Sequence, residues 1–461
     1  MRDLCLSLME PKHIQKPERL PFSNRDIQKM IVPLFFEQLL VMLVGIADTF
    51  MISYAGDAAV SGVSLVNMFN TIFLYLFTAL ASGGAVVVSQ YIGSRNREKS
   101  ADAAGQMLML ITGISVVFMG AALIWNRQLL GLLFGSVEEP VMEACVIYLR
   151  ISAYSFPALA VYNAGAALCR SMGRTKVTMQ ISLWSNGINI IGNAIGIFAL
   201  HAGVAGVAYP SLIARLFSAV AVTVLCLSRK NAVFYRMRSI FSWQRDMIRR
   251  ILRVAVPNGV ENGMFQLIKV ALSSVTALFG TAQIAANGIA QSFWSLAALV
   301  GVAMGPAFIT VIGQCMGAGD IRAADYYFEK LYRITLWLSV LWNALILAAT
   351  PLILLLYPLS REITGLVFQL VLIHNVCNAV LFPRSGAFAN GLRAAGDVTF
   401  TMYVSVLSTV FCRLVLSIVL GIWLNMGVIG VAVAMCCEWG VRALCFAWRY
   451  RSGKWKRFSV I

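Results

Sequence analysis

Long apolar runs, each bounded by a short polar or basic stretch, recur along the whole chain. About 20 mostly apolar residues suffice for an α-helix to cross the hydrocarbon core of a membrane. The pattern therefore predicts an all-α polytopic membrane protein with about 12 transmembrane helices. The predicted runs are residues 30–53, 60–84, 103–125, 141–163, 177–200, 204–228, 252–279, 283–309, 331–357, 363–390, 399–424 and 427–449.

Composition supports this interpretation and excludes an ordinary soluble chain. Of the 461 residues, 59% are hydrophobic and only 12% are charged, which cannot supply the surface of a soluble protein of this length. The ten cysteines lie mostly inside the predicted spans, as small buried hydrophobic residues. No nucleotide-binding glycine motif, zinc-protease motif or metal-spaced cysteine pair occurs, so we expect neither an enzyme nor a cofactor.

The net charge of +17 is distributed over alternate loops. Basic residues gather at 95–99, 170–176, 229–250 and 449–457. The other loops hold little that is basic beyond Arg127 and Arg361. By the positive-inside rule both termini and the central loop are cytoplasmic, so the partner of this charge is the lipid bilayer and not nucleic acid. The charged, proline-containing segment before the first predicted span does not resemble a cleavable signal peptide, and short loops favour a bacterial inner membrane.

The sequence also repeats itself at one constant offset, the one that places Glu37 on Glu261. Other pairs matched by this offset are Val32-Pro33 with Val256-Pro257, Gln90 with Gln314 and Gly93 with Gly317, and later Arg170-x-x-Gly173 resembles Arg393-x-x-Gly396. Two homologous halves of six spans each must have the same orientation in the membrane. Two such bundles facing one cleft are typical of an alternating-access transporter. The predicted organisation is a cytoplasmic segment (1–29), a first lobe (30–228), a basic linker (229–251), a second lobe (252–449) and a basic tail (450–461).

Three acids inside predicted spans are candidates for ion or proton coupling: Glu37, Asp48 and Glu261. Glu37 and Asp48 are 11 residues apart, which places them within about 20° on one helix face and about 16 Å apart along it. Leu272 stands in the second half where the first half has Asp48. A carboxyl at the membrane centre costs about 2.5–3.5 kcal/mol, so such residues usually have a role. A buried acid can hold a proton, or release it and bind Na⁺ or an organic cation.

The alternative role for these acids is a buried ion pair. Candidate partners are Lys269, Arg215, Arg413 and Arg442. Glu438 lies four residues before Arg442 on one helix, which favours a structural pair there.

Amides in the fifth predicted span add neutral oxygen ligands. Asn189 and Asn193 share a helix face and suit either a monovalent ion or hydrogen bonding between helices. His374 and Arg384 also lie within a span, and His374 could relay protons or simply be hydrogen-bonded.

Mild polarity within an apolar interior predicts a cavity for flat, lipophilic organic cations. Gln38 matches Asn262 across the repeat, and Asn67 matches Gln291. The remaining candidates for substrate contact are Met68, Phe265, Phe293 and Trp294.

Several short motifs resemble the multidrug and toxic compound extrusion (MATE) transporters. They are Asp48-Thr49, Gly56-Asp57-Ala58-Ala59, Val88-Ser89-Gln90-Tyr91-Ile92-Gly93, Gly313-Gln314-x-x-Gly317 and Leu392-Arg393-Ala394-Ala395-Gly396-Asp397. The resemblance implies a V-shaped antiporter of 12 helices that exports cationic drugs in exchange for Na⁺ or H⁺.

The resemblance also assigns roles to particular residues. Asp48 matches the first-span aspartate that binds a cation or proton in relatives, and Glu261 matches the glutamate used in the second lobe of other members. Asn193 stands where relatives often have aspartate, and no aspartate occurs near Phe382-Pro383. The retained Asp48 favours the first lobe as the coupling lobe. We expect a monomer.

Three other functions compete with this interpretation. A flippase for lipid-linked oligosaccharides or cell-wall precursors would use arginines such as Arg215, Arg384 and Arg413 on a pyrophosphate. A major facilitator is disfavoured because the loop GSRNREKSAD lacks its signature. A receptor or scaffold would have no need of acids at matching depth in both halves.

Overall fold

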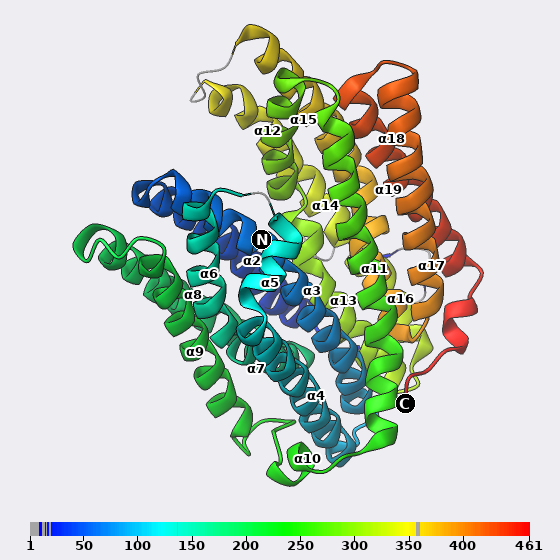
Figure 1. The fold of residues 1–461 in the computed structure, drawn as a ribbon. Coiled ribbons are helices and arrows are strands. Elements are labelled where there is room, and N and C mark those ends of the chain that lie inside the picture. Colours follow the sequence, from blue (N-terminus) through cyan, green and yellow to red (C-terminus); the bar gives the residue numbers. More distant parts are fainter. Residues whose placement is uncertain (1–8, 12–13, 15, 18–19, 136, 356–359) are drawn as a thin grey trace. The chain divides into compact units, whose positions relative to one another are not determined.

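The computed structural model describes residues 9–11, 14, 16–17, 20–135, 137–355 and 360–461, and within these ranges the chain is helical without strands (Figure 1). Every predicted run falls on a helix or on consecutive helices, which confirms the fold class. Parts of the predicted segment 1–29 and the last residues of the run 331–357 lie outside the described residues. The helices are α2 (Asn24–Ile52), α3 (Asp57–Gly93), α4 (Arg97–Ile124), α5 (Asn126–Phe134), α6 (Glu139–Tyr154), α7 (Phe156–Ser171), α8 (Thr175–Ala194), α9 (Ala205–Leu227), α10 (Met237–Phe241), α11 (Arg245–Ala277), α12 (Thr281–Ala297), α13 (Leu299–Gly317), α14 (Ile321–Leu354), α15 (Arg361–Phe382), α16 (Phe388–Ala395), α17 (Val398–Ser408), α18 (Leu416–Ile418) and α19 (Gly427–Arg451).

Most of these helices meet the requirements for crossing a membrane. Within the described ranges, nine helical segments are long and apolar enough, or ten if α6 and α7, bent by 45° at Ser155, form one span. The predicted spans on α8 and α11 fall short because of polar residues, including Asn189 and Asn193 on α8 and Glu261 on α11. Both of these spans therefore owe their lower hydropathy in part to candidate site residues.

The chain forms two compact units. The first unit is Val32–Gly259, and the second is Met1–Ile31 together with Val260–Ile461. In the first unit α9 packs against α7 and α8, and α4 packs against α3 and α7. In the second unit α15 packs against α12, α14 and α19, and α13 packs against α14 and α16.

Each unit has its own apolar core. In the first unit the core includes Val66 and Leu149, which are fully buried. In the second unit Ala290, Leu370 and Val371 are fully buried in the corresponding cluster. Burial of these side chains holds helices together through close packing, since lipid offers no hydrophobic advantage to contact between helices.

The internal repeat is visible in the backbone. Residues with positive φ recur at the offset that relates Glu37 to Glu261: Gly56 (98°) and Gly280 (88°), Arg95 (57°) and Gly319 (72°), His201 (47°) and Asn425 (54°), and Gly203 (55°) and Gly427 (57°). The π-helical segments Ile195–Ala199 and Val419–Trp423 are related by the same offset. The same turns therefore close the same helices in both halves.

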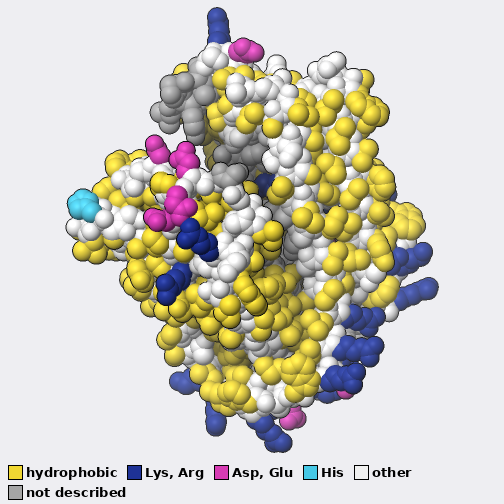
Figure 2. Space-filling model, in the orientation of Figure 1, with side chains coloured by type: hydrophobic (Ala, Val, Ile, Leu, Met, Phe, Trp, Pro, Cys, Tyr) yellow, Lys and Arg dark blue, Asp and Glu magenta, His cyan; other side chains and the backbone are white. Residues whose placement is uncertain are grey.

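The exterior is apolar along the helices and basic at the tail. Figure 2 shows hydrophobic side chains over most of the visible face, with Lys and Arg side chains near the C-terminal end. The tail is held on the second unit because Lys456 pairs with Asp325 at 2.6 Å and the side chain of Trp455 is completely buried. An apolar surface of this extent is typical of a protein embedded in lipid.

Candidate functional site

Asp48 lies on α2 in a polar cluster built from three helices of the first unit. Asn193 Nδ2 donates to Asp48 Oδ1 at 2.7 Å and to Asn189 Oδ1 at 3.3 Å. Asn189 Nδ2 in turn donates to Ser211 Oγ on α9 at 2.9 Å. The two asparagines are one helical turn apart on α8, so both amides point at the neighbouring helices.

No cation in the described part of the chain forms an ion pair with Asp48. Arg215 is close enough to act on it electrostatically, but its Nη1 donates to Ser155 Oγ at 2.6 Å. Asn193 Oδ1 is buried and has no hydrogen-bond partner among the described residues. The cluster thus offers a half-buried carboxylate beside an unsatisfied amide oxygen, a combination that can hold a proton or a small monovalent cation. Within the described ranges no three His, Cys, Asp or Glu side chains gather as a metal site.

Glu37 lies on the same helix as Asp48 but in a different environment. Only 3% of its surface is exposed, and Arg170 pairs with it at 2.5 Å. Thr178 Oγ1 donates to the second carboxylate oxygen at 2.8 Å, and the Tyr162 hydroxyl donates to the first at 3.4 Å. Both oxygens of Glu37 therefore have hydrogen-bond donors beside them.

Glu261 on α11 is paired with two arginines. Arg393 Nη2 lies 2.5 Å from its Oε2, and Arg442 Nη2 lies 3.0 Å from its Oε1. Arg442 also pairs with Glu438 at 3.4 Å, as the sequence predicts, and Arg413 pairs with Glu438 at 2.8 Å. Lys269, another candidate partner, forms no ion pair with Glu261 in the described part of the chain.

The ion pairs of Glu37 and Glu261 are equivalent in the repeat. Glu37 and Glu261 are related by the repeat offset, and their partners Arg170 and Arg393 are related by the same offset less one position. Both motifs are recognisable in the sequence, but their pairing with the two acids was not predicted because it depends on how the helices pack. Glu37 and Arg170 recur as Glu261 and Arg393 at almost the same offset. This recurrence is the sequence signal that could have identified the two ion pairs.

The other predicted site residues of the first unit are distributed around these clusters. Gln38 is half-buried, and Asn67 accepts a hydrogen bond from the Tyr148 hydroxyl at 3.2 Å. Met68 is 61% exposed on α3. Nothing in the geometry joins Gln38 or Met68 to the Asp48 cluster.

A pocket of about 210 Å³ in the second unit brings together three predicted residues, Phe265, Gln291 and Trp294. Asn262 is half-buried and is not among its lining residues, and Phe293 is buried in the apolar core of this unit. His374 on α15 is also buried, and neither of its ring nitrogens has a hydrogen-bond partner in the described chain.

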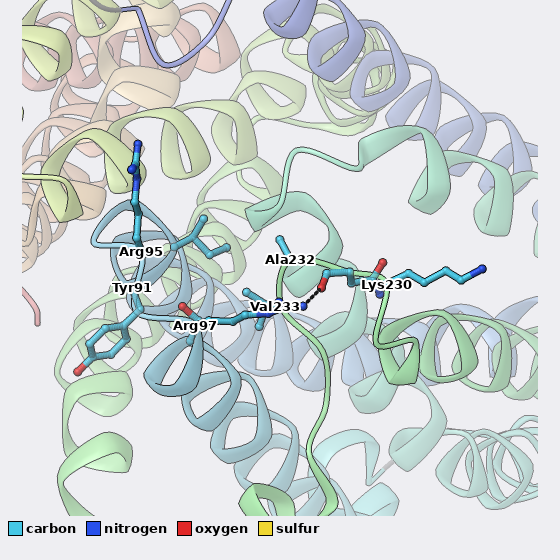
Figure 3. A pocket seen from close by; sticks show the side chains of 9 residues that line it. Tyr91, Arg95, Arg97, Lys230, Ala232 and Val233 are labelled. Carbon is cyan, nitrogen blue, oxygen red and sulfur yellow. Dashed lines mark hydrogen bonds between the residues drawn. The ribbon is translucent and has the colours of Figure 1, made fainter.

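A larger pocket, of about 520 Å³, lies in the first unit between the start of α4 and the loop after α9. Its basic side chains do not converge: Arg95 and Lys230 point in different directions, and Arg97 donates to the carbonyl oxygen of Asn231 at 2.9 Å (Figure 3). Divergent charges of this kind are typical of the positive-inside pattern.

Comparison with known proteins connects both halves to one family. The MatE family model matches residues 33–195 and 257–419. The chain is 26% identical to the uncharacterized transporter YisQ of Bacillus subtilis, over 96% of each chain. It is 23% identical to the probable multidrug resistance protein NorM of Thermotoga maritima, over 98% of this chain and 97% of that one. A solved crystal structure of MATE in complex with MaL6 has the same fold, with a TM-score of 0.87 and 20% identity over 94% of this chain and 97% of that one. Since the same family model matches residues 33–195 and again residues 257–419, together more than half of the chain, the chain belongs to the MATE family of transporters.

Proposed function

We propose that this protein is a secondary active antiporter that exports lipophilic organic cations in exchange for H⁺ or Na⁺. One observation carries the proposal. Of the three acids predicted to couple, Asp48 alone has no ion-pair partner in the described chain, whereas Glu37 and Glu261 are held by arginines. An acid that alternately binds a proton or Na⁺ and an organic cation must be free of a permanent counter-ion.

Exchange follows from competition for this carboxylate. A charged carboxylate in a low-dielectric site is costly without a partner, so Asp48 is stable when it holds a proton, a sodium ion or a cationic guest. Asn193 Oδ1 and Asn189 Oδ1 would complete the ligands of a small cation. If the inorganic ion and the guest cannot be bound together, binding of one releases the other, and alternating access turns this release into antiport.

The substrate class and location rest on composition and on the relatives. NorM of Thermotoga maritima is described as a probable multidrug resistance protein, which supports drug-like substrates here. The 26 Phe and 20 Met residues supply an adaptable apolar interior suited to lipophilic cations. We place both termini in the cytoplasm because the basic loops alternate. The short loops favour the bacterial inner membrane, and we propose that the protein is a monomer there.

A flippase of the same broader fold is the alternative function, and the arginines support it less well. Arg413 pairs with Glu438 at 2.8 Å, and Arg384 lies 4.0 Å from Glu329. An acid already offsets the charge of each of these arginines, so neither supplies the full positive charge that a pyrophosphate requires, although an unpaired nitrogen can still donate a hydrogen bond.

The test is dye export by cells that express the protein. We expect expression to expel ethidium and Asp48→Asn to abolish export at an unchanged protein level. Asp57→Asn, which removes an exposed acid at the start of α3, is the matched control and should export normally. Undiminished export by Asp48→Asn would remove Asp48 from the mechanism.

The coupling ion is measured in everted vesicles. Dye-driven proton release that does not depend on Na⁺ would identify H⁺ as the coupling ion. Dye-driven movement of Na⁺ without proton release would identify Na⁺ as the coupling ion. Dye movement that responds to neither gradient would contradict antiport.

A further inference from the structure

The 210 Å³ pocket of the second unit has a chemistry that the export of cations does not explain. Its lining includes two basic side chains and no acid. The lining residues are Phe265, Lys269, Leu272, Ser273, Thr276, Asn287, Gln291, Trp294, Arg413, Val431 and Met435.

This pocket is the counterpart, in the repeat, of the Asp48 cluster. At the offset that relates Glu37 to Glu261, Leu272 corresponds to Asp48, and Met435 corresponds to Ser211. The Asp48 cluster and this pocket therefore occupy equivalent positions in the two halves of the repeat. In the first unit that position carries a carboxylate, and in the second it carries apolar side chains beside cations.

Three hydrogen-bond donors of the pocket have no partner among the described residues. Arg413 is only 5% exposed, and its Nη2 is buried without a hydrogen bond. Trp294 Nε1 is likewise buried and unpaired. Lys269 is exposed on α11 and has neither an ion pair nor a hydrogen bond within the described ranges. Buried donors without acceptors cost about 1–3 kcal/mol each, so an acceptor that entered the pocket would recover free energy.

The surrounding charge is also unbalanced. Two acids, Glu261 and Glu438, face three arginines, Arg393, Arg413 and Arg442, which leaves one excess positive charge in this network. Lys269, which also lines the pocket, adds a second positive charge. An excess of buried positive charge attracts an anion.

The pocket walls indicate what carries that anion. Phe265 lies against Arg413, whose guanidinium is 4.7 Å from the ring centroid, and Leu272, Trp294 and Met435 supply further apolar surface. A ring or short apolar body can pack on these walls while its charged group reaches the donors.

We propose that this pocket binds the oxyanion group, such as a carboxylate, of an amphiphile with an aromatic or apolar body. Binding itself does not require transport. If the antiport proposed above holds, the substrates extend to zwitterions, which carry such an oxyanion in addition to a cationic group.

Binding is measured by equilibrium dialysis of the purified full-length chain in detergent. The probe is 2-naphthoate, and 2-naphthamide is the neutral compound with the same ring. We expect naphthoate to bind about tenfold more tightly than the amide, because charge-assisted hydrogen bonds are the stronger ones. Equal binding of the two compounds would overturn the proposal.

Matched variants locate the site. Lys269→Gln should weaken naphthoate binding about fivefold, whereas Lys269→Arg should retain it. Trp294→Phe keeps an aromatic wall but removes the donor, and should also weaken binding. Arg95→Gln removes a positive charge from the other basic pocket and should change nothing. A loss of binding with Arg95→Gln, or none with Lys269→Gln, would refute the assignment.

Two further comparisons complete the test. One distinguishes a lipid headgroup from a small amphiphile as the source of the oxyanion, and the other distinguishes a failure of the antiporter proposal from a failure of the pocket proposal. Displacement of naphthoate by phosphatidylglycerol, but not by phosphatidylcholine, would identify a lipid headgroup as the bound oxyanion. Absence of displacement would identify a small amphiphile. Ethidium export tests the antiporter, and naphthoate binding tests the pocket, so either result can fail without the other.

Discussion

The ion pair between Glu37 and Arg170 gives the sharpest quantitative test of which acids are structural. Arg170→Gln would leave a carboxylate that is 3% exposed with only Thr178 and Tyr162 as partners. Leaving a buried charge without its counter-ion in this way lowers the free energy of unfolding by about 3–5 kcal/mol. In the double variant Glu37→Gln/Arg170→Gln neither charge remains, and the two amides can still bond to their neighbours, so we expect a cost of about 1 kcal/mol.

The double variant should therefore be more stable than the single Arg170→Gln variant by about 2–4 kcal/mol. The measurement is the free energy of unfolding in mixed micelles, from titration of the purified protein with a denaturing detergent. The same double variant should still export ethidium when protein levels are matched, because Glu37 is held by a permanent counter-ion. A double variant no more stable than Arg170→Gln would show that the two residues are not coupled. A double variant that is stable but inactive would return Glu37 to the coupling mechanism.

Three further predictions concern packing and helix ends, and each is measured by the same unfolding titration. Gly62→Val should cost about 1–3 kcal/mol of unfolding free energy, because a Cβ at this position would lie 2.7 Å from a side chain of α6. The control Gly113→Val, where a Cβ would have no neighbouring atom within 4 Å, should stay within about 0.5 kcal/mol of the parent, and equal effects of the two variants would contradict the packing argument. Trp455→Ala should cost about 3–5 kcal/mol, because this side chain is completely buried, and a neutral result would mean that the tail is not docked in solution. Asp320→Ala removes the oxygen that accepts from the backbone N–H of Ala323 at 2.9 Å and should cost about 1 kcal/mol, whereas Asp320→Asn should restore most of the loss.

Hydrophobic patterning was sufficient for the fold class but not for the details of the spans. The predicted run 60–84 continues in the structure as a helix to Gly93, because Ser89 and Gln90 are fully buried within the protein and need no lipid. The run 141–163 is broken into α6 and α7 at Ser155. Pro157, at the start of α7, was the local signal for that break.

The candidate site was predicted only as far as single helices allow. Spacing placed Asn189 and Asn193 on one face of a helix, which the structure confirms. It could not show that Asn193 bonds to Asp48, since the two residues are 145 positions apart and meet only through the packing of α2 and α8. Arg442, one of the predicted partners, does pair with Glu261, whereas Arg170 and Arg393 were not predicted as partners because their pairing depends on how the helices pack.

The long sequence separation within the two equivalent ion pairs has a consequence for biosynthesis. Glu37 is synthesised 133 residues before Arg170, and Glu261 is synthesised 132 residues before Arg393. At about 5–20 residues per second, roughly 7–27 s pass between the synthesis of each acid and that of its counter-ion. During that interval the nascent helix carries an acid without its counter-ion, which costs about 2.5–3.5 kcal/mol in the bilayer, so we expect the helix to be retained near the insertion machinery. Ribosome-arrested chains that end before Arg170 should therefore leave α2 extractable by alkali, whereas chains that expose Arg170 should not.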